Sequence, residues 1–280
     1  MELNVLLVSL LPMDEELFSA SNSVKDIRMF EKAMDRAKER EDDYSIKVYI
    51  YDDALGYMAG VISKRSNVQL HDRDFEVHNE DNYPPVIWFW DRDEQVILVE
   101  NKPSVFSSAT VAAKAFSNIT NNIVLAESGL RAHIHPKLIE SAFWETFDSF
   151  KYVNEVRFNL AAPNMFGSTK KEIGDFLHEV VDETNASEFS PVFKNQDGNL
   201  NLKPSSWLNA MVDWVREGAG NWSIKGRNNH KDRYKSISSK QRAKLLVIDG
   251  NITELELENY KPSDVAEIVG MLRDRYTYKK

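Results

Sequence analysis

The alternation of apolar and polar positions divides the chain into short segments of strand and helix. Residues 5–11 form an apolar run with the length and composition of a buried strand. Residues 24–40 instead carry apolar side chains at every third or fourth position between charged ones, which predicts an amphipathic helix. The same patterns predict further elements, namely strands at residues 45–51, 55–63, 75–78, 86–90 and 95–100 and a helix at residues 109–117.

Helices and strands alternate more evenly after Asn121 and Asn122, which form the predicted boundary between two domains. The predicted elements are strands at residues 123–133 and 153–160, helices at residues 138–147, 170–182 and 207–216, two strands within residues 222–238, and a closing helix behind Pro262. Because both parts mix helices with antiparallel strands, the predicted class is α+β. We expect two domains, residues 1–120 and 121–280, each a mostly antiparallel sheet with packed helices.

The composition removes several classes of chemistry. The chain has no cysteine, which excludes disulfides, thiol catalysis, Cys-ligated zinc and iron–sulfur clusters. The early apolar run is short and soon meets Asp14, Glu15 and Glu16, so we predict neither a secretory signal nor a membrane span. We therefore expect a cytoplasmic protein that does not insert into a membrane.

Charge is distributed unevenly along the chain. Residues 1–120 hold 22 acidic and 13 basic residues, whereas residues 121–280 hold 22 of each, so the whole net charge of −9 lies in the first part. Residues 222–244, called here the basic segment, hold eight Lys and Arg residues against Asp232, a local charge of +7. A basic island in an acidic protein is typical of a face that meets polyanions.

The basic segment has the pattern of a β-hairpin. Residues 222–227 and 233–238 read as two strands joined by a loop of five residues. On the first strand Lys225 and Arg227 share a face, while Trp222 and Ile224 share the opposite one. The second strand predicts the same division, with its cations on one face and Tyr234 on the other.

A turn that is symmetric about His230 would set Lys225 opposite Lys235 and Arg227 opposite Arg233. Like charges opposed across a ladder are destabilising, so such a face would favour a bound anion. A following strand would continue the cationic pattern. The predicted nucleic-acid-binding residues are Lys225, Arg227, Lys231, Arg233, Lys235, Lys240, Arg242 and Lys244.

No base-reading motif accompanies these cations, which favours binding by charge neutralisation without sequence preference. Duplex DNA is the expected ligand, since a two-stranded ribbon can follow phosphates or enter a groove, and RNA is an alternative. The same segment could instead be a solvated strand pair that docks on the acidic domain of its own chain or forms a dimer contact.

A second hypothesis is a Mg²⁺-dependent nuclease. Residues 86–102 contain an Asp, an apolar strand and a Glu-x-Lys ending, which are similar to the motif of restriction-type nucleases. By that analogy Asp91 and Glu100 would hold Mg²⁺ and Lys102 would assist. The spacing favours ordinary hairpin ends, because Asp91 adjoins the turn.

Two histidine clusters offer metal-ligating atoms at strand-like spacing: His71, Asp72, Asp74 and His78 in one, and His133 and His135 in the other. Either pair of histidines would need further ligands from elsewhere in the fold. The chain contains no phosphate-binding loop, dinucleotide fingerprint or nucleophile elbow. We therefore predict no catalytic residue, no metal and no cofactor.

Three segments carry a resemblance to known proteins: VNEVRFNLAAPN at residues 153–164 with the helix after it, WSIKGRNNHKDRYKSISSKQRAKLLVID at residues 222–249, and VIWFWDRDEQVILVENKPSVF at residues 86–106. In element order the first two resemble the second half of RexA-like phage-exclusion proteins. The third is similar in layout to uncharacterised bacterial proteins of mobile elements and phage defence. The resemblance implies a two-domain α+β homodimer that binds duplex DNA without sequence preference and acts beside a membrane or effector partner. Only residues 225–244 carry over as a matching site.

The sequence therefore predicts a non-enzymatic nucleic-acid-binding protein of phage defence or exclusion. The alternatives are the nuclease and a pure protein-interaction component of a defence system, in which the acidic first domain recruits a partner.

Overall fold

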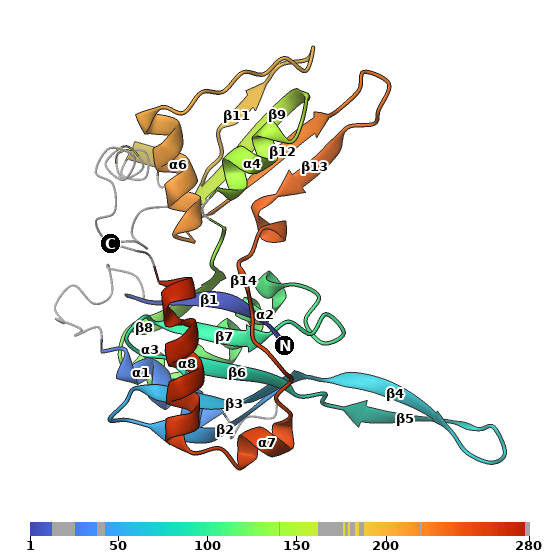
Figure 1. Cartoon of the computed structure of the whole chain (residues 1–280), viewed down its shortest axis with the longest axis vertical. Helices are drawn as coiled ribbons and strands as arrows, with labels where there is room; N and C mark the ends of the chain where they lie inside the picture. Colours follow the sequence, from blue (N-terminus) through green and yellow to red (C-terminus); the bar gives the residue numbers. More distant parts are fainter. Residues whose placement is uncertain are drawn as a thin grey trace. The chain divides into compact units, whose positions relative to one another are not determined.

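A computed structural model of the chain describes residues 1–12, 26–37, 43–139, 141–161, 176, 179, 183–184, 188–218 and 220–277 (Figure 1). The chain forms two compact units. Unit 1 consists of Met1–His135 together with Leu245–Lys280, and unit 2 consists of Pro136–Lys244. Both units combine antiparallel sheets with packed helices, so the predicted α+β class is confirmed.

Unit 1 is built on a seven-stranded sheet with the order β14-β1-β7-β6-β3-β2, in which β8 also pairs with β1. Its strands are β1 (Glu2–Pro12), β2 (Tyr44–Asp52), β3 (Tyr57–Lys64), β6 (Val86–Asp91), β7 (Val96–Glu100), β8 (Leu130–Pro136) and β14 (Leu245–Val247). Its helices are α1 (Arg28–Ala37), α2 (Ala109–Thr120), α3 (Ile123–Glu127), α7 (Glu254–Glu258) and α8 (Pro262–Tyr276).

Helices cover both faces of this sheet. On one face Phe89 packs in a cluster with Val265 and Val269 of α8. On the other, Trp90 contacts the ring of Phe30 in α1 at 4.9 Å between centroids, and Trp88 contacts Phe116 of α2 at 6.1 Å. Because each side of the sheet is covered, the residues of β6 are all buried, which explains its continuous apolar sequence.

The unit boundary differs from the one predicted at residue 120. Asn122 is the N-cap of α3, and its amide also donates to the carbonyl of Ala33, so this position lies inside unit 1. Residues 123–127, predicted as part of a strand, are helical because the Asn122 side chain accepts from the Val124 N–H and starts a helical turn. The C-terminal segment also returns to unit 1, since β14 pairs with β1 and α8 packs on the sheet.

A two-stranded hairpin, β4 (Ser66–His71) with β5 (Val77–Asn82), extends away from the seven-stranded sheet of unit 1 (Figure 1). The sequence predicted only the start of β5, because the polar composition of β4 hides its strand character. Every residue of the two strands is exposed. This hairpin and its tip, residues 66–82, are called the arm.

Unit 2 is built on a five-stranded sheet with the order β10-β9-β12-β13, in which β11 also pairs with β9. Its elements are β9 (Tyr152–Ala161), β10 (Glu188–Phe189), β11 (Val192–Lys194), β12 (Gly220–Arg227), β13 (Lys235–Ser238), α4 (Ala142–Asp148), α6 (Ser206–Arg216) and the 3₁₀ turn η2 (Ser239–Gln241). The helix predicted at residues 170–182 falls largely outside the described residues. Among the described helices of both units, none combines the length and the apolar character that a membrane crossing requires.

Candidate nucleic-acid interface

The strand β12 alternates between a buried and an outward face. Trp222 and Ile224 are buried at 1% and 0% exposure beneath α4 and α6. Lys225 and Arg227 occupy the alternate positions. Lys225 is exposed and Arg227 is half-buried. The division predicted for this strand is therefore confirmed, and the two cations lie on the sheet face opposite the helices.

The register of the hairpin differs by one residue from the predicted symmetric turn. Lys225 pairs with Ser236, and Gly226 pairs with Lys235. Lys235 therefore lies on the opposite face from Lys225, and no pair of like charges is opposed at these positions. The loop between the strands is correspondingly longer, residues 228–234 in place of 228–232.

Tyr234 lies on the cationic face rather than opposite it. Its ring is 4.7 Å from the Arg227 guanidinium carbon and 5.7 Å from the Lys225 ammonium nitrogen. These are cation–π contacts. Beside them the ring of His230 lies 4.1 Å from that of Tyr152, the first residue of β9. The end of the sheet thus combines three aromatic rings with cations.

The loop is held by its own hydrogen bonds. The backbone N–H and the side-chain amide of Asn229 both donate to the Asp232 carboxylate at 3.1 Å. The Arg227 guanidinium donates to the carbonyl of His230 at 2.6 Å. Lys231 and Arg233 are exposed between these anchors, so the loop presents two cations to solvent.

Two neighbouring strands add cations that the sequence reasoning missed. Lys225 lies opposite Glu155 of β9, and Glu155 lies opposite Lys194 of β11. Arg157, two residues further along β9, is also exposed. The alternation of apolar and polar residues along β9 indicates that Glu155 and Arg157 point outward, but it does not reveal that β9 pairs with β12.

Glu155 sits within this group of cations. It lies 3.3 Å from the Lys194 ammonium and 3.1 Å from the Arg157 guanidinium. Burial opposes its ionisation, but Lys194 and Arg157 outweigh burial and hold the pKa of this carboxyl below its usual value. The cations on this side of the sheet and on its loop outnumber Glu155, Glu188 and Asp232, so the face keeps a positive balance.

Several of the remaining outward positions are hydroxyls and amides, supplied by Ser223, Ser236, Asn159 and Asn221. Such side chains are common partners of phosphate and sugar oxygens. Val192, opposite Arg157, and Glu188, opposite Ala161, lie on the same side. We define the basic face as this outward side of the sheet with its loop, and its cations as Arg157, Lys194, Lys225, Arg227, Lys231 and Arg233. Chemically, the basic face can neutralise several phosphates and offer aromatic rings beside them.

Lys240, Arg242 and Lys244 were predicted to lie on a third strand next to the basic face, and they do not. Lys240 is exposed on η2, a 3₁₀ turn. Arg242 donates through Nε to the Thr146 hydroxyl of α4 at 3.1 Å. Lys244 is half-buried, and its backbone N–H donates to the carbonyl of Lys137. The strand predicted here is interrupted because Ser238 and Gln241 form a capping box that turns the chain.

The nuclease residues are not brought together. Glu100 accepts from the N–H of Ile87 at 3.2 Å, and Ile87 lies four residues before Asp91 on β6, a separation of about 13 Å along a strand. Asp91 is buried and accepts from Arg273 at 2.8 and 3.0 Å and from the Tyr276 hydroxyl at 2.5 Å. Lys102 donates to the carbonyl of Pro85. Each group has a structural partner of its own.

The first histidine cluster lies at the tip of the arm. Asp72, Glu76 and His78 offer ligand atoms within 4.8 Å of one another, and all three are exposed. Glu76 replaces the predicted His71 and Asp74 in this group. The Asp72 carboxylate has a structural role, since it accepts hydrogen bonds from two backbone N–H groups of the tip at 2.9 Å.

The second cluster is a pair of neighbouring imidazole rings that are tilted by 34°. The rings of His133 and His135 lie 5.2 Å apart. His135 is 8% exposed, and neither ring nitrogen has a hydrogen-bond partner. Burial, with a smaller contribution from His133, lowers the pKa of His135 to about 3, so this imidazole is neutral at physiological pH.

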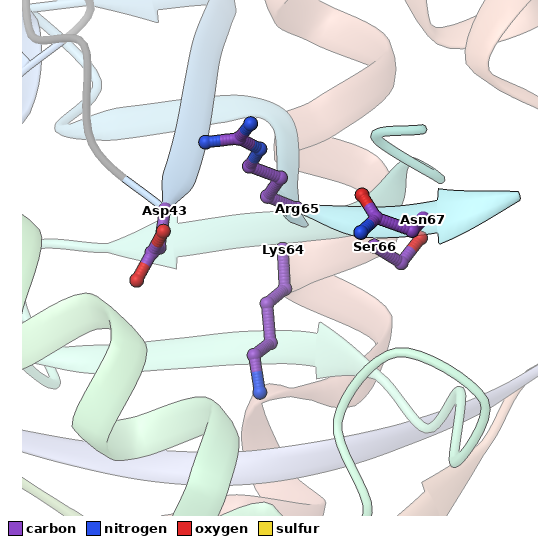
Figure 2. Close-up of a pocket in the computed structure, with 5 residues that line it drawn as sticks. All are labelled: Asp43, Lys64, Arg65, Ser66 and Asn67. Atoms are coloured by element: carbon purple, nitrogen blue, oxygen red, sulfur yellow. The ribbon is translucent and has the colours of Figure 1, made fainter. Parts of the chain in front are cut away.

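A cavity of about 290 Å³ lies at the root of the arm and is lined by Asp43, Lys64, Arg65, Ser66 and Asn67 (Figure 2). In Figure 2 the side chains of Lys64 and Arg65 point to opposite sides of the strand. Arg65 forms an ion pair with Asp81 at 2.8 Å, and its N–H donates to the carbonyl of Asp43. These contacts hold the root of the arm to the end of β3 and to the residue before β2.

The sequence matches the model of one protein family, described as a domain of unknown function (DUF4747), over residues 59–260, well over half of the chain. The match spans the arm, the strands β6 and β7 and all of unit 2. No curated protein matches the sequence.

Proposed function

The chain belongs to the DUF4747 family, and we propose that this member binds nucleic acid without sequence preference and without catalysis. The observation that carries the proposal is the basic face of unit 2, where the sheet places Arg157, Lys194, Lys225 and Arg227 on one side. The family description assigns no activity, so the argument rests on this face.

Charge placement supports the proposal. The protein has a net charge of −9, yet the basic segment within it has a local charge of +7. An acidic surface elsewhere repels a polyanion, whereas the basic face attracts it and orients the encounter. Neutralisation of phosphates releases counterions, which supplies the free energy of binding without any contact to bases.

Duplex DNA is the ligand that we propose. The basic face presents cations, hydroxyls and amides across neighbouring strands, and these groups can follow a phosphate backbone. The rings of Tyr152, His230 and Tyr234 are already in contact with one another or with Arg227. We therefore assign them to shaping the face, and RNA or single strands become outcomes of the test.

In the cell we propose a cytoplasmic role in phage defence or exclusion, in which DNA binding is coupled to an effector protein. This part of the proposal rests on the resemblance in element order to RexA-like proteins. It predicts that variants which lose DNA binding also lose protection of the host in a phage plating assay.

Charge reversal on the basic face tests the proposal. We expect Lys225→Glu with Arg233→Glu to weaken binding of a duplex of about 30 base pairs by about tenfold or more, because two phosphate contacts become repulsive. Fluorescence anisotropy of a labelled duplex with arbitrary sequence measures the affinity. The matched control is Lys32→Glu with Lys114→Glu, two exposed cations on helices of unit 1 that change the net charge equally.

The control variant should bind as the wild type does. Equal loss in both variants would mean that only net charge matters, and unchanged affinity in the first variant would remove the basic face from the proposal. Circular dichroism of each variant verifies that the fold is intact. A gel of the same samples, taken with Mg²⁺ present, reveals any cleavage of the duplex.

A further inference from the structure

The arm has the construction of a docking element. Its two six-residue strands pair with each other, and every residue in them is exposed. A two-stranded hairpin without a packed face is only marginally stable in water. A hairpin of this length would gain stability if another protein surface covered it.

One side of the arm carries apolar side chains. Val68 and Leu70 point to the same side, paired with Glu80 and His78 across the ladder. Their exposed fractions are 36% and 44%. The opposite side is formed mainly by amides, with Asp81 and with Val77 near the tip. The arm therefore offers a narrow apolar stripe with Glu80 beside it.

The tip presents an exposed aromatic side chain. Phe75 is 84% exposed and has a positive φ of 63°, a conformation that a bulky residue adopts at a cost. The Asp72 carboxylate holds the tip by accepting from the N–H groups of Asp74 and Glu76. A large exposed ring at the tip of a projecting element is the form of an interface anchor.

Charge decides what the arm can contact. It holds five acidic residues against Arg73, a local charge of −4. Pairing two arms symmetrically would oppose these acids and is disfavoured. The complementary surface on this same chain is the basic face, which combines cations with the half-buried rings of Tyr152 and Tyr234.

We propose that the arm of one molecule docks on the basic face of a second copy. Acidic side chains of the arm lie against the cations of the face, and Phe75 packs on its aromatic rings. Two such contacts related by a two-fold axis close a dimer. The inference uses the same face as the proposed function but requires no nucleic acid. It further implies that duplex DNA and the arm compete for the face.

Exchange of charge between the two surfaces tests this contact. The arm variant is Asp74→Lys with Glu80→Lys, and the face variant is Lys225→Glu with Arg233→Glu. Sedimentation velocity of the full chain, at about 0.05 M and about 0.5 M salt, measures association without nucleic acid. We expect the wild type to dimerise at the lower salt and each variant alone to be monomeric.

An equimolar mixture of the two variants is the decisive sample. One of the two contacts then joins an unaltered arm to an unaltered basic face, and the other joins the two sets of substituted positions, whose charges have been exchanged, so we expect a heterodimer. A second arm variant, Leu70→Ser with Phe75→Ser, keeps the charges and should weaken wild-type association at least tenfold. A monomeric wild type, a dimer that persists in either charge variant, or a mixture that stays monomeric would overturn the inference.

The two proposals fail separately. If the wild type dimerises as described but binds no duplex in the anisotropy assay, the basic face is a protein interface and the proposed function is wrong. If it binds duplex but remains monomeric, the arm does not dock on a second copy and the proposed function stands. Competition is read from the same samples, because added duplex should dissociate the dimer.

Discussion

Individual side chains decide which face of each sheet is buried. In β12 the large apolar Trp222 and Ile224 determine the inward side, and the outward position of Lys225 and Arg227 follows from them. This division could be predicted from the sequence. The partner of each polar residue could not, since Glu155 meets Lys194 through a strand pairing that no local pattern encodes.

Asp91 shows the same limit. Its metal-binding role was suggested only by similarity to a nuclease motif, and its partners Arg273 and Tyr276 lie far along the chain on α8. A carboxylate that is buried and bonded to a guanidinium and a hydroxyl has little capacity left for a metal ion. The role of Asp91 therefore depends on tertiary contacts.

At His135 we expect a measurable dependence of stability on pH. The pKa of the buried imidazole is about 3, whereas that of an unfolded histidine is about 6.5. Below about pH 6.5 the unfolded chain takes up a proton that the folded chain refuses. The contribution of the neutral imidazole is complete above that pH and is lost as the pH falls towards 3.

The variant His135→Phe removes the group that takes up this proton in the unfolded chain, and so isolates its effect on stability. When the pH is lowered from about 7.5 to about 5.5, the free energy of unfolding should fall by about 1.4 kcal/mol less in this variant than in the wild type. Urea unfolding at both pH values measures the difference, and His71→Phe, an exposed position on the arm, is the control. Identical pH dependence in His135→Phe and the wild type would contradict the burial of a neutral imidazole.

At the scale of elements, segments with strong apolar periodicity form helices and strands close to the predicted positions. The pairing between distant segments is what the sequence did not predict. The strands β6 and β7 and the helix α6 follow their patterns because apolar residues alone determine them. β4 was missed because its exposed, polar sequence has no buried face to produce a pattern. The return of α8 to unit 1 closes a contact between the two ends of the sequence, which local reasoning cannot reveal.

The assignment of α8 to unit 1 can be tested by a matched pair of substitutions. Val269 is fully buried against the sheet and Met271 is 65% exposed on the same helix. We expect Val269→Asp to destabilise unit 1 by about 3 kcal/mol or more, because a charge is placed in an apolar core. Met271→Asp should change the free energy of unfolding by about 0.5 kcal/mol or less. Equal effects in chemical unfolding would contradict the packing of α8.

At the scale of the whole molecule, charge and shape are divided between parts. Unit 1 carries the acidic arm with Phe75 at its tip, and unit 2 carries the basic face. The basic segment was predicted to be a functional site from the placement of its charges and from its β-hairpin pattern. The arm was not predicted, because its significance lies in exposed apolar side chains, and exposure is a property of the folded chain.

The salt dependence of duplex binding tests the central claim most directly. For wild-type protein and a labelled duplex, we expect the logarithm of the affinity to fall linearly with the logarithm of salt concentration, at a slope of about −0.9 per phosphate neutralised. With about four cations of the basic face engaged, the slope should be roughly −4, and it should become shallower in Lys225→Glu with Arg233→Glu. A slope that is the same in both proteins, or no binding at the lowest salt, would contradict the account.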